Sequence, residues 1–491
     1  MLSGSRVDVV SIGNPYEWIH PGGTDHVSDL ERAAELLGSQ KAMLWPSPYG
    51  FPKVAVVLRA PSSELRDHVS SLLGVALPEV VCPRQRTDSI CDDLLADREA
   101  FESLVALLDP EAGVHLAPYM QTPGVERVAA ALEARGFELV ERPRHSALVD
   151  RWSSKALIDL EVYRRDPAIA RARPQSFVAE TEDDLGRLFQ KLFAAGLERV
   201  VVKTSRSAGG AGVFFVRLSD AVVEADPVAV LATRGVNVHH VEAPFLVEEE
   251  ISWVFSPSVD LDVRPGGVVA LIGCGIQRLF DRRYYAGFAA TDEMYASPWF
   301  RDAFEVASRV ADRFAREGFT GPLNFDFVVT AEGRVVLIET NVRRSALCDG
   351  FGLAELLGAQ GALGRSTSRF SAVSVADYVE SRWTHAPGEL IAGLGAIETD
   401  GALVLSSDAA LLEESPLYRW VSVISVASSL ERAEAGLGSA LGAVMGLDPD
   451  AAVAAHGALH PREVSPADPN STGRPSAVPA NALDRAPGIE R

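Results

Sequence analysis

The sequence predicts a protein of several domains that combines α/β and α+β architecture. At 491 residues the chain is longer than the roughly 250 to 300 residues at which single hydrophobic cores stop growing. Its first part alternates short apolar runs with helical patterns, which is typical of an α/β layer. Its middle part has apolar runs that follow one another directly, which is typical of antiparallel sheets.

Composition and charge limit the function classes. The chain is 47% hydrophobic and 23% charged, as expected for a globular protein, and its formal net charge is −21. Phosphate backbones and anionic lipids would repel such a chain, so we expect no nucleic-acid partner and no membrane partner, and any phosphate site must be local. The four cysteines lack CxxC spacing and no apolar run reaches the length of a membrane span, which predicts a cytoplasmic protein with reduced thiols.

Residues 1–149 are predicted to form an α/β domain. Thr122 occupies an N-cap position, Pro123 the first helical position, and Gly136 lies just past the helix end. Strands are expected before and after this helix, and this βαβ unit predicts parallel pairing. The expected strands of the domain are 7–12, 54–58, 79–81, 114–116 and 138–140.

Two further domains are expected at 150–250 and 251–372. The first contains a helix that begins after the N-cap Thr181, then a strand, a glycine loop and a second strand. From 245 to 280 three strands follow one another with a Pro-Gly-Gly turn at 265–267, which predicts antiparallel pairing. Residues 373–455 read as a smaller α/β segment, and residues 456–491, rich in Pro and Ala without apolar periodicity, are expected to be disordered.

The stretch KTSRSAGGAGVFFV at 203–216 places Lys203 shortly before three glycines, Gly209, Gly210 and Gly212. A loop without side chains lets backbone N–H groups approach an anion closely, and a lysine at its mouth supplies the opposite charge. The stretch is neither a P-loop nor a GxGxxG fingerprint, because a strand follows it. A flexible hairpin loop with an ordinary strand lysine remains the alternative.

Oxygen ligands gather in NFDFVVTAEGRVVLIETNVRR. Asp326 lies on one predicted strand, and Glu339 and Asn341 lie two residues apart on the next, with Arg343 continuing the same face. Carboxylate and amide oxygens suit Mg²⁺, which completes its shell with nucleotide phosphates and water. A lone strand Asp is usually a structural group, but the four residues together point to a metal site.

From about residue 150 to 344 the chain resembles the ATP-grasp carboxylate–amine ligases, in which two α+β subdomains clamp ATP between antiparallel sheets. Four features match in order: Lys155 in DRWSSK, Lys203 before the glycine loop, the acidic segment VEEEI, and the metal strands. The resemblance implies that both lysines bind the α- and β-phosphates. It implies a lid made of Gly209, Gly210 and Gly212, an adenine edge made of Glu248, Glu249 and Ile251, and Mg²⁺ ligands Asp326, Glu339 and Asn341.

Two looser likenesses extend this comparison. The stretch GCGIQRLF is similar to a strand of several ATP-grasp enzymes, which implies that Gln277 and Arg278 lie near the nucleotide or the reacting carboxylate. For Arg283 and Tyr285, which follow in the same stretch, a solvated turn is the favoured expectation and a place near the nucleotide is the alternative. Residues 1 to 150 resemble the pre-ATP-grasp domain of peptide ligases of the pheganomycin ligase type, although SALCDGFG follows ETNVRR where such ligases tend to have a Gly-Thr-His-Pro type of sequence.

The resemblance implies an ATP-dependent ligase that activates a carboxylate as an acylphosphate and joins it to an amine, releasing ADP and phosphate. Arg343 and Arg278 are the expected catalytic residues, ATP and Mg²⁺ the expected cofactors, with two ions and with Mn²⁺ as a substitute. Small-molecule carboxylates and amines are the expected substrates, and a homodimer is the candidate assembly. The alternatives are an ATP-grasp enzyme with another acceptor and a nucleotide-binding regulatory module without turnover.

Overall fold

The structure is a computed structural model of the chain. It describes residues 6–15, 17, 29–74, 76–87, 89–205, 207, 210, 212–223, 231, 243–358, 372–383, 387–397, 399, 401–412 and 419–457. Apart from 456 and 457, the predicted disordered tail at 456–491 lies outside the described residues. No helix in these ranges is long and apolar enough to cross a membrane.

The N-terminal part forms a parallel five-stranded sheet in the order β3-β2-β1-β4-β5. The predicted parallel pairing around the βαβ unit is confirmed, and the Thr122 hydroxyl accepts a hydrogen bond from the Val125 N–H as an N-cap. The strands are β1 Val7–Ile12, β2 Val54–Val56, β3 Glu79–Val81, β4 Gly113–Pro118 and β5 Leu139–Glu141. The helices are α1 Asp29–Gln40, η2 Lys41–Leu44, α2 Ser63–Leu73, α3 Ile90–Ala96, α4 Arg98–Leu107 and α5 Pro123–Ala134.

A small antiparallel sheet in the order β6-β9-β7-β8 follows a run of short helices. Its strands are β6 Ser176–Ala179, β7 Arg199–Thr204, β8 Val213–Arg217 and β9 Phe245–Glu249. The helices before it are α6 Ser146–Ser153, α7 Lys155–Ile158, the π-helix η3 Asp159–Tyr163 and α8 Pro167–Arg171. Two helices, α9 Glu182–Ala194 and α10 Leu218–Val223, pack on the sheet and share its apolar core.

The largest sheet has eight strands, all antiparallel to their neighbours, in the order β14-β13-β10-β11-β12-β15-β17-β16. Residues 373–455, expected as a smaller segment, contribute three of its strands. The strands are β10 Pro257–Arg264, β11 Val268–Phe280, β12 Tyr284–Thr291, β13 Gly321–Val329, β14 Val335–Asn341, β15 Ala372–Glu380, β16 Ala402–Ser407 and β17 Trp420–Ala427. The helices are η5 Asp292–Ala296, α12 Pro298–Arg316, α13 Cys348–Gly358, α14 Pro387–Gly395, η6 Ala409–Leu412, α15 Leu430–Met445 and α16 Pro449–Gly457.

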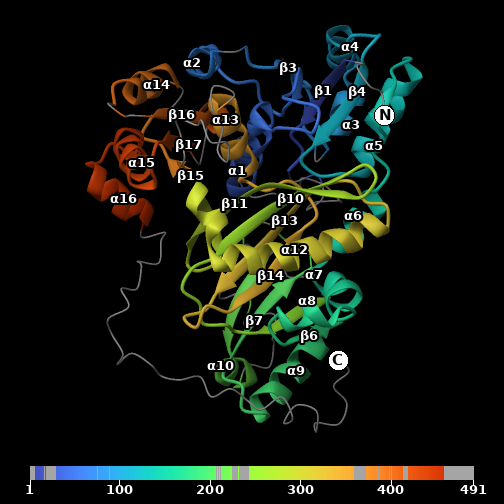
Figure 1. The fold of residues 1–491 in the computed structure, drawn as a ribbon, viewed down its shortest axis with the longest axis vertical. Helices are drawn as coiled ribbons and strands as arrows, with labels where there is room; N and C mark the ends of the chain where they lie inside the picture. Colours follow the sequence, from blue (N-terminus) through green and yellow to red (C-terminus); the bar gives the residue numbers. More distant parts are fainter. Residues whose placement is uncertain are drawn as a thin grey trace.

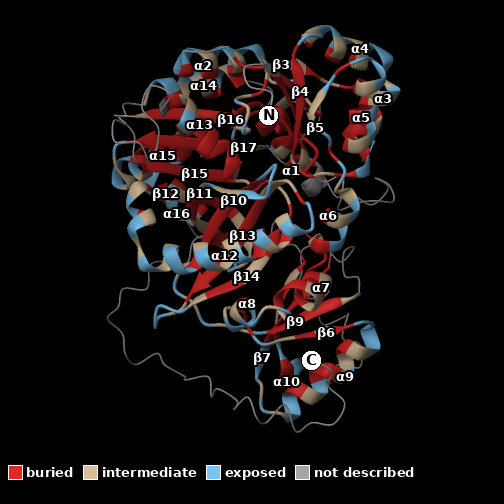
Figure 2. Cartoon of the chain, turned by 45° about the vertical axis from the view of Figure 1, so that its right-hand side comes forward, coloured by how far each residue is buried: buried red, intermediate tan, exposed pale blue. Residues whose placement is uncertain are grey.

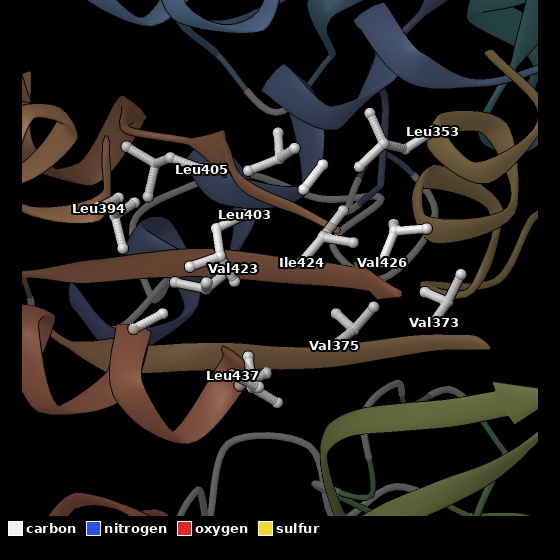
Figure 3. Close-up of a cluster of buried hydrophobic side chains, with 14 of the residues drawn as sticks. Leu353, Val373, Val375, Leu394, Leu403, Leu405, Val423, Ile424, Val426 and Leu437 are labelled. Carbon is white, nitrogen blue, oxygen red and sulfur yellow. The ribbon is translucent and has the colours of Figure 1, made fainter. Parts of the chain in front are cut away.

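The eight-stranded sheet holds the two largest apolar cores. Helix α12 buries one stripe of residues at helical spacing, and Phe314 on that stripe stacks on Trp152 with ring centroids 3.8 Å apart. Figure 2 shows the buried strands and the exposed outer side of α12. The other core lies where β15, β16 and β17 meet the surrounding helices, and Figure 3 shows Val375, Val423 and Leu437 within it.

In Figure 1 the small sheet lies at one end of the molecule and the N-terminal sheet at the other, with the eight-stranded sheet between them. Helices α14, α15 and α16 lie to one side, over the C-terminal strands. This arrangement lets side chains from the small sheet and from helices and loops of the N-terminal domain meet along the eight-stranded sheet.

Candidate functional site

A cleft runs between the small sheet and the eight-stranded sheet and reaches the N-terminal domain. Its empty volume is about 1600 Å³, including the solvent at its mouth. Most of the predicted site residues line it: Lys203, Gly210, Glu248, Glu249, Ile251, Gln277, Asp326, Glu339, Asn341 and Arg343. Figure 1 shows β7 of the small sheet beside β14, and the Lys203 ammonium donates a hydrogen bond to the Ile338 carbonyl across that gap at 2.6 Å.

The glycine loop joins β7 to β8 as an antiparallel hairpin. Gly210 has φ +84° and packs so closely that a Cβ there would lie 2.1 Å from the Arg283 carbonyl oxygen. A Cβ on Gly212 would lie 2.1 Å from the Thr204 hydroxyl oxygen. Both positions therefore require glycine, because the backbone approaches its neighbours directly. Gly209 lies outside the described residues.

Two buried lysines flank the loop. The Lys155 ammonium, at the start of α7, lies 2.9 Å from the Ser207 hydroxyl and 3.2 Å from the Glu339 carboxylate. Burial lowers the pKa of Lys155, against the opposing effect of Glu339. Lys203 on β7 pairs with the Glu248 carboxylate at 2.6 Å. Each lysine thus has a carboxylate partner on a different strand of the cleft.

In the acidic segment at 248–251 one side chain is buried in ion pairs, and the others are at least partly exposed. The Glu248 carboxylate is buried and accepts from both Lys203 and Arg173, so only its backbone is free to meet a ligand in the cleft. The Glu249 side chain is exposed, and Ile251 is partly buried. All three residues line the cleft. The assignment of this segment to an adenine edge therefore concerns its backbone and the side chain of Ile251.

The acidic pair lies on neighbouring strands, because Asp326 on β13 is the register partner of Glu339 on β14. Asp326 accepts hydrogen bonds from Gln277 Nε2 at 2.5 Å and from the Ser258 hydroxyl at 2.9 Å. Burial and the Glu339 charge raise the pKa of Asp326 to about 7. The pKa of Glu339 is lowered, because Lys155, Lys203 and Arg343 outweigh the effect of its burial.

Asn341 and Arg343 continue the same face. The Asn341 amide donates to Asp326 Oδ2 at 3.0 Å, and its oxygen accepts from the Arg343 guanidinium at 2.8 Å. Arg343 also donates to the Tyr119 hydroxyl at 2.9 Å. The predicted face of alternate residues on β14 thus brings the amide and the guanidinium beside the acidic pair.

Gln277 and Arg278 point to opposite sides of β11. Gln277 reaches Asp326 in the cleft, whereas Arg278 donates to the Ser374 hydroxyl at 2.5 Å and pairs with Glu434 on α15. The expectation that Arg278 lies near the reacting groups is therefore wrong. Consecutive residues of a strand face opposite ways, so at most one of the two can line the cleft.

The oxygen donors of the cleft fit Mg²⁺. In the described part of the chain no group of three or more His, Cys, Asp and Glu side chains is arranged to hold a metal ion. Two carboxylates on adjacent strands with one amide nevertheless match an ion that takes one or two protein carboxylates and completes its shell with phosphate oxygens and water. The donors are hard oxygen atoms, which excludes a thiolate-type site.

Sequence reasoning missed several residues of this site. Asn324 donates to the Ser258 hydroxyl at 2.6 Å and to Asp260 at 2.7 Å, and its position two residues before Asp326 could have revealed it by strand alternation. The expected solvated turn at Arg283 and Tyr285 is wrong: the Arg283 side chain is only 8% exposed, and Tyr285 lines the cleft.

Comparisons with known proteins agree with this architecture. Residues 54–134 match the pre-ATP-grasp domain family, while no curated protein matches the sequence. The structure is similar to a biotin carboxylase–β,γ-ATP complex from Campylobacter jejuni, with 13% identity and a TM-score of 0.50 over 89% of this chain and 91% of that one.

Two other solved structures are also similar. An N5-carboxyaminoimidazole ribonucleotide synthetase in complex with ADP shares 16% identity over 90% of this chain and 97% of that one, with a TM-score of 0.49. The biotin carboxylase domain of the 2-oxoglutarate carboxylase from Hydrogenobacter thermophilus shares 15% identity over 88% and 89%, also with a TM-score of 0.49. The family match together with the biotin carboxylase likeness identifies the fold: this chain has the ATP-grasp fold, preceded by an α/β pre-ATP-grasp domain.

Proposed function

We propose that the chain is an ATP-dependent carboxylate–amine ligase that forms an amide or peptide bond and releases ADP and phosphate. The proposal rests on one observation. Lys203, a glycine hairpin and a carboxylate pair followed by an amide and a guanidinium meet in one cleft between two antiparallel sheets, and buried Lys155 pairs with Glu339 at its wall. The similar biotin carboxylase structure is itself a complex with a β,γ-ATP ligand, which supports a nucleotide in this cleft.

The positive charges of the cleft would bind the phosphates. Lys203 and Gly210 line the cleft, and Lys155 contacts both Ser207 of the glycine loop and Glu339 of the cleft wall, so both lysines would lie close to phosphates bound there. Asp326, Glu339 and Asn341 would hold Mg²⁺, which when bound neutralises charge on the phosphate oxygens. Arg343 would stabilise the charge that develops on the transferred phosphoryl group or on the acylphosphate oxygens.

No nucleophilic side chain is needed for this reaction. A carboxylate oxygen attacks the terminal phosphorus of ATP as the P–O bond to ADP breaks. The uncharged amine then attacks the acyl carbon, the C–O bond to phosphate breaks, and the nitrogen gives up a proton to the departing phosphate or to water. Positioning and charge neutralisation supply most of the catalysis in phosphoryl transfer. The pre-ATP-grasp domain, which resembles that of the peptide ligases named above, supports an amino acid or a peptide as the substrate class.

The test is ADP release by the purified protein with a panel of carboxylates and amines, compared with that of the Glu339→Gln variant. Glu339→Gln keeps the side-chain volume but removes one charge from the metal site. We expect turnover per folded molecule to fall by orders of magnitude, and thermal unfolding without nucleotide to show some loss of stability because buried Lys155 loses its carboxylate partner. Near-normal turnover of the variant, or no pair-dependent ADP release by the parent protein, would contradict the proposal.

A further inference from the structure

A second group of charges lies at the end of the cleft that meets the N-terminal domain. Lys41 on η2 places its ammonium 2.5 Å from the Asp377 carboxylate on β15 and 3.1 Å from the Asp349 carboxylate on α13. All three residues are buried, with 4%, 1% and 0% of their surfaces exposed, and all three line the cleft. We call Lys41, Asp349 and Asp377 the acidic end of the cleft.

The acidic end holds two carboxylates and one ammonium group, so it has one negative charge in excess. Apart from the Lys41 ion pair, neither oxygen of Asp349 has a hydrogen-bond partner among the described residues, and neither has Oδ2 of Asp377. The Ser422 hydroxyl and Lys41 bond to Oδ1 of Asp377, and the buried Tyr285 phenol lies beside the same carboxylate. Buried carboxylate oxygens without partners are costly and rare, so the two oxygens of Asp349 in particular can accept hydrogen bonds from a donor outside the chain.

The backbone at the acidic end is irregular. The pairing of β15 with β17 shifts register between Ala376 and Val379, so Asp377 and Tyr378 lie in a β-bulge. Tyr378 has φ +57°, a left-handed conformation that few residues other than glycine adopt. Bulges and left-handed residues are frequent beside active sites, where they redirect a side chain. Here the bulge carries Asp377 at the wall of the cleft.

The acidic end lies in the same cleft as Arg343 and the proposed phosphate-binding residues. The Arg343 guanidinium donates a hydrogen bond to the Tyr119 hydroxyl, and burial and Asp377 raise the pKa of the Tyr378 phenol although the Arg343 charge opposes this shift. Lys41 acts on the pKa of the same two tyrosines. Arg343 and the acidic end therefore line the same cleft, where a second substrate could approach an acylphosphate.

We propose that Asp349 and Asp377 bind the ammonium group of the amine substrate, so that this ligase uses primary amines that are cationic in solution, and that one of these carboxylates takes a proton from the ammonium group before its nitrogen attacks the acylphosphate. The inference rests on the proposed function and adds the site of the second substrate to it. A carboxylate substrate does not fit here, because Lys41 is already paired with both acidic residues. The donors of an ammonium group match the acceptor oxygens that the chain leaves without partners.

The experiment separates the two substrates. Hydroxylamine, which is uncharged at pH 8, captures an acylphosphate as a hydroxamate, so hydroxamate formation reports activation of the carboxylate without a bound amine. We expect Asp377→Asn and Asp349→Asn to raise the KM for the amine by about tenfold or more, as the loss of one charge-assisted contact predicts. Hydroxamate formation and the KM for the carboxylate should stay within about twofold of the parent values.

The control is Asp8→Asn. Asp8 is also buried and also paired with a lysine, Lys53 at 2.5 Å, but it does not line the cleft. We expect it to leave the KM for the amine unchanged. Asp377→Asn and Asp349→Asn could instead lower amide and hydroxamate formation equally, or lower neither. In either case the acidic end only stabilises the fold, and the inference is wrong. If the parent protein makes neither ADP nor hydroxamate with any carboxylate, the proposed function itself fails.

A measurement on the parent protein keeps the inference testable should the variants not fold. An analogue of the amine substrate with a hydroxyl group in place of the ammonium group should inhibit at least about ten times more weakly than an unreactive cationic analogue of the same shape. Equal inhibition by the two analogues would overturn the inference, because a site built for an ammonium group must prefer the cation.

Discussion

Single residues of the cleft neutralise one another before a ligand arrives. Lys155 pairs with Glu339, Lys203 with Glu248, and Lys41 with Asp377, each across two different elements. A buried charge without a partner costs several kcal/mol, so these pairs let the chain keep a strongly charged cavity folded. The phosphates and the metal would then exchange partners with groups that are already desolvated and positioned, which reduces the reorganisation that accompanies binding.

Glu248 shows that a residue of this cleft can serve folding more than binding. Its carboxylate is the shared partner of Lys203 and Arg173, and the Arg173 guanidinium also donates to the Leu337 carbonyl on β14 at 2.8 Å. Glu248→Gln would leave two buried cations short of one negative charge, so we expect a loss of about 3 kcal/mol in the free energy of unfolding, measured with urea. The exposed neighbour gives the control: Glu249→Gln should change it by less than about 0.5 kcal/mol. Equal effects of the two variants would contradict this role.

His115 provides a pH-dependent contribution to stability. Burial and the Arg344 charge lower its pKa to about 3, whereas the unfolded chain binds the proton near pH 6.5. The stabilisation is therefore complete above about pH 6.5 and is lost as the pH falls toward 3, because only the unfolded state takes up the proton. Between pH 7.5 and pH 5.5 the parent should lose about 1.4 kcal/mol more than His115→Gln in urea unfolding. Parallel pH profiles of the two proteins would refute this.

At the scale of elements, the β7–β8 hairpin depends on two separate properties of Gly210. An alanine at this position would be strained by the left-handed φ of +84°, and its Cβ would clash with the Arg283 carbonyl oxygen at 2.1 Å. Gly333, in the turn between β13 and β14, has φ +80° but open space around it. Gly333→Ala should thus cost only the conformational penalty, about 1 to 2 kcal/mol of stability, and leave ATP binding unchanged.

Gly210→Ala should cost more than Gly333→Ala in thermal unfolding, because the hairpin must move away from β12. It should also weaken ATP binding, measured by calorimetry with Mg²⁺ present, since the hairpin can no longer cover the cleft in the same position. If the two alanine variants bind ATP equally well, the hairpin does not contact the nucleotide.

Local signals made most elements predictable. The capping residues Thr122 and Thr181 both accept the expected backbone hydrogen bonds, and the alternation of Glu339, Asn341 and Arg343 placed one face of β14 in the cleft. Arg278 could not be placed in the same way. The alternation of side chains along a strand shows that Gln277 and Arg278 lie on opposite faces of the sheet, but it does not show which face lines the cleft. Tertiary pairing decides this, and it joins β11 to strands far away in the sequence.

Long-range pairing also explains what stayed hidden at the scale of the whole molecule. Strand β12 pairs with β15, so the segment after residue 372 continues the sheet that carries the acidic pair. Lys41, Asp349 and Asp377 meet only because the N-terminal domain contacts that extension. No local pattern in the sequence connects three residues so far apart. The cleft is thus formed by the small sheet, the eight-stranded sheet and helix and loop residues of the N-terminal domain together.

The adjacent residues Gln277 and Arg278 test whether this cleft is the active site. Arg278 connects β11 to β15 and α15 through Ser374 and Glu434, so it should hold the C-terminal strands and helix in place rather than act on substrate. Because the Glu434 side chain is 43% exposed, Arg278→Met should cost only about 1 kcal/mol in urea unfolding, with ADP release per folded molecule unchanged. Gln277→Met removes a hydrogen bond to Asp326 in the cleft, so it should lower ADP release at least about tenfold while stability changes less. The opposite pattern, with activity lost in Arg278→Met and kept in Gln277→Met, would restore Arg278 to the reacting groups and would mean that the cleft described here is not the active site.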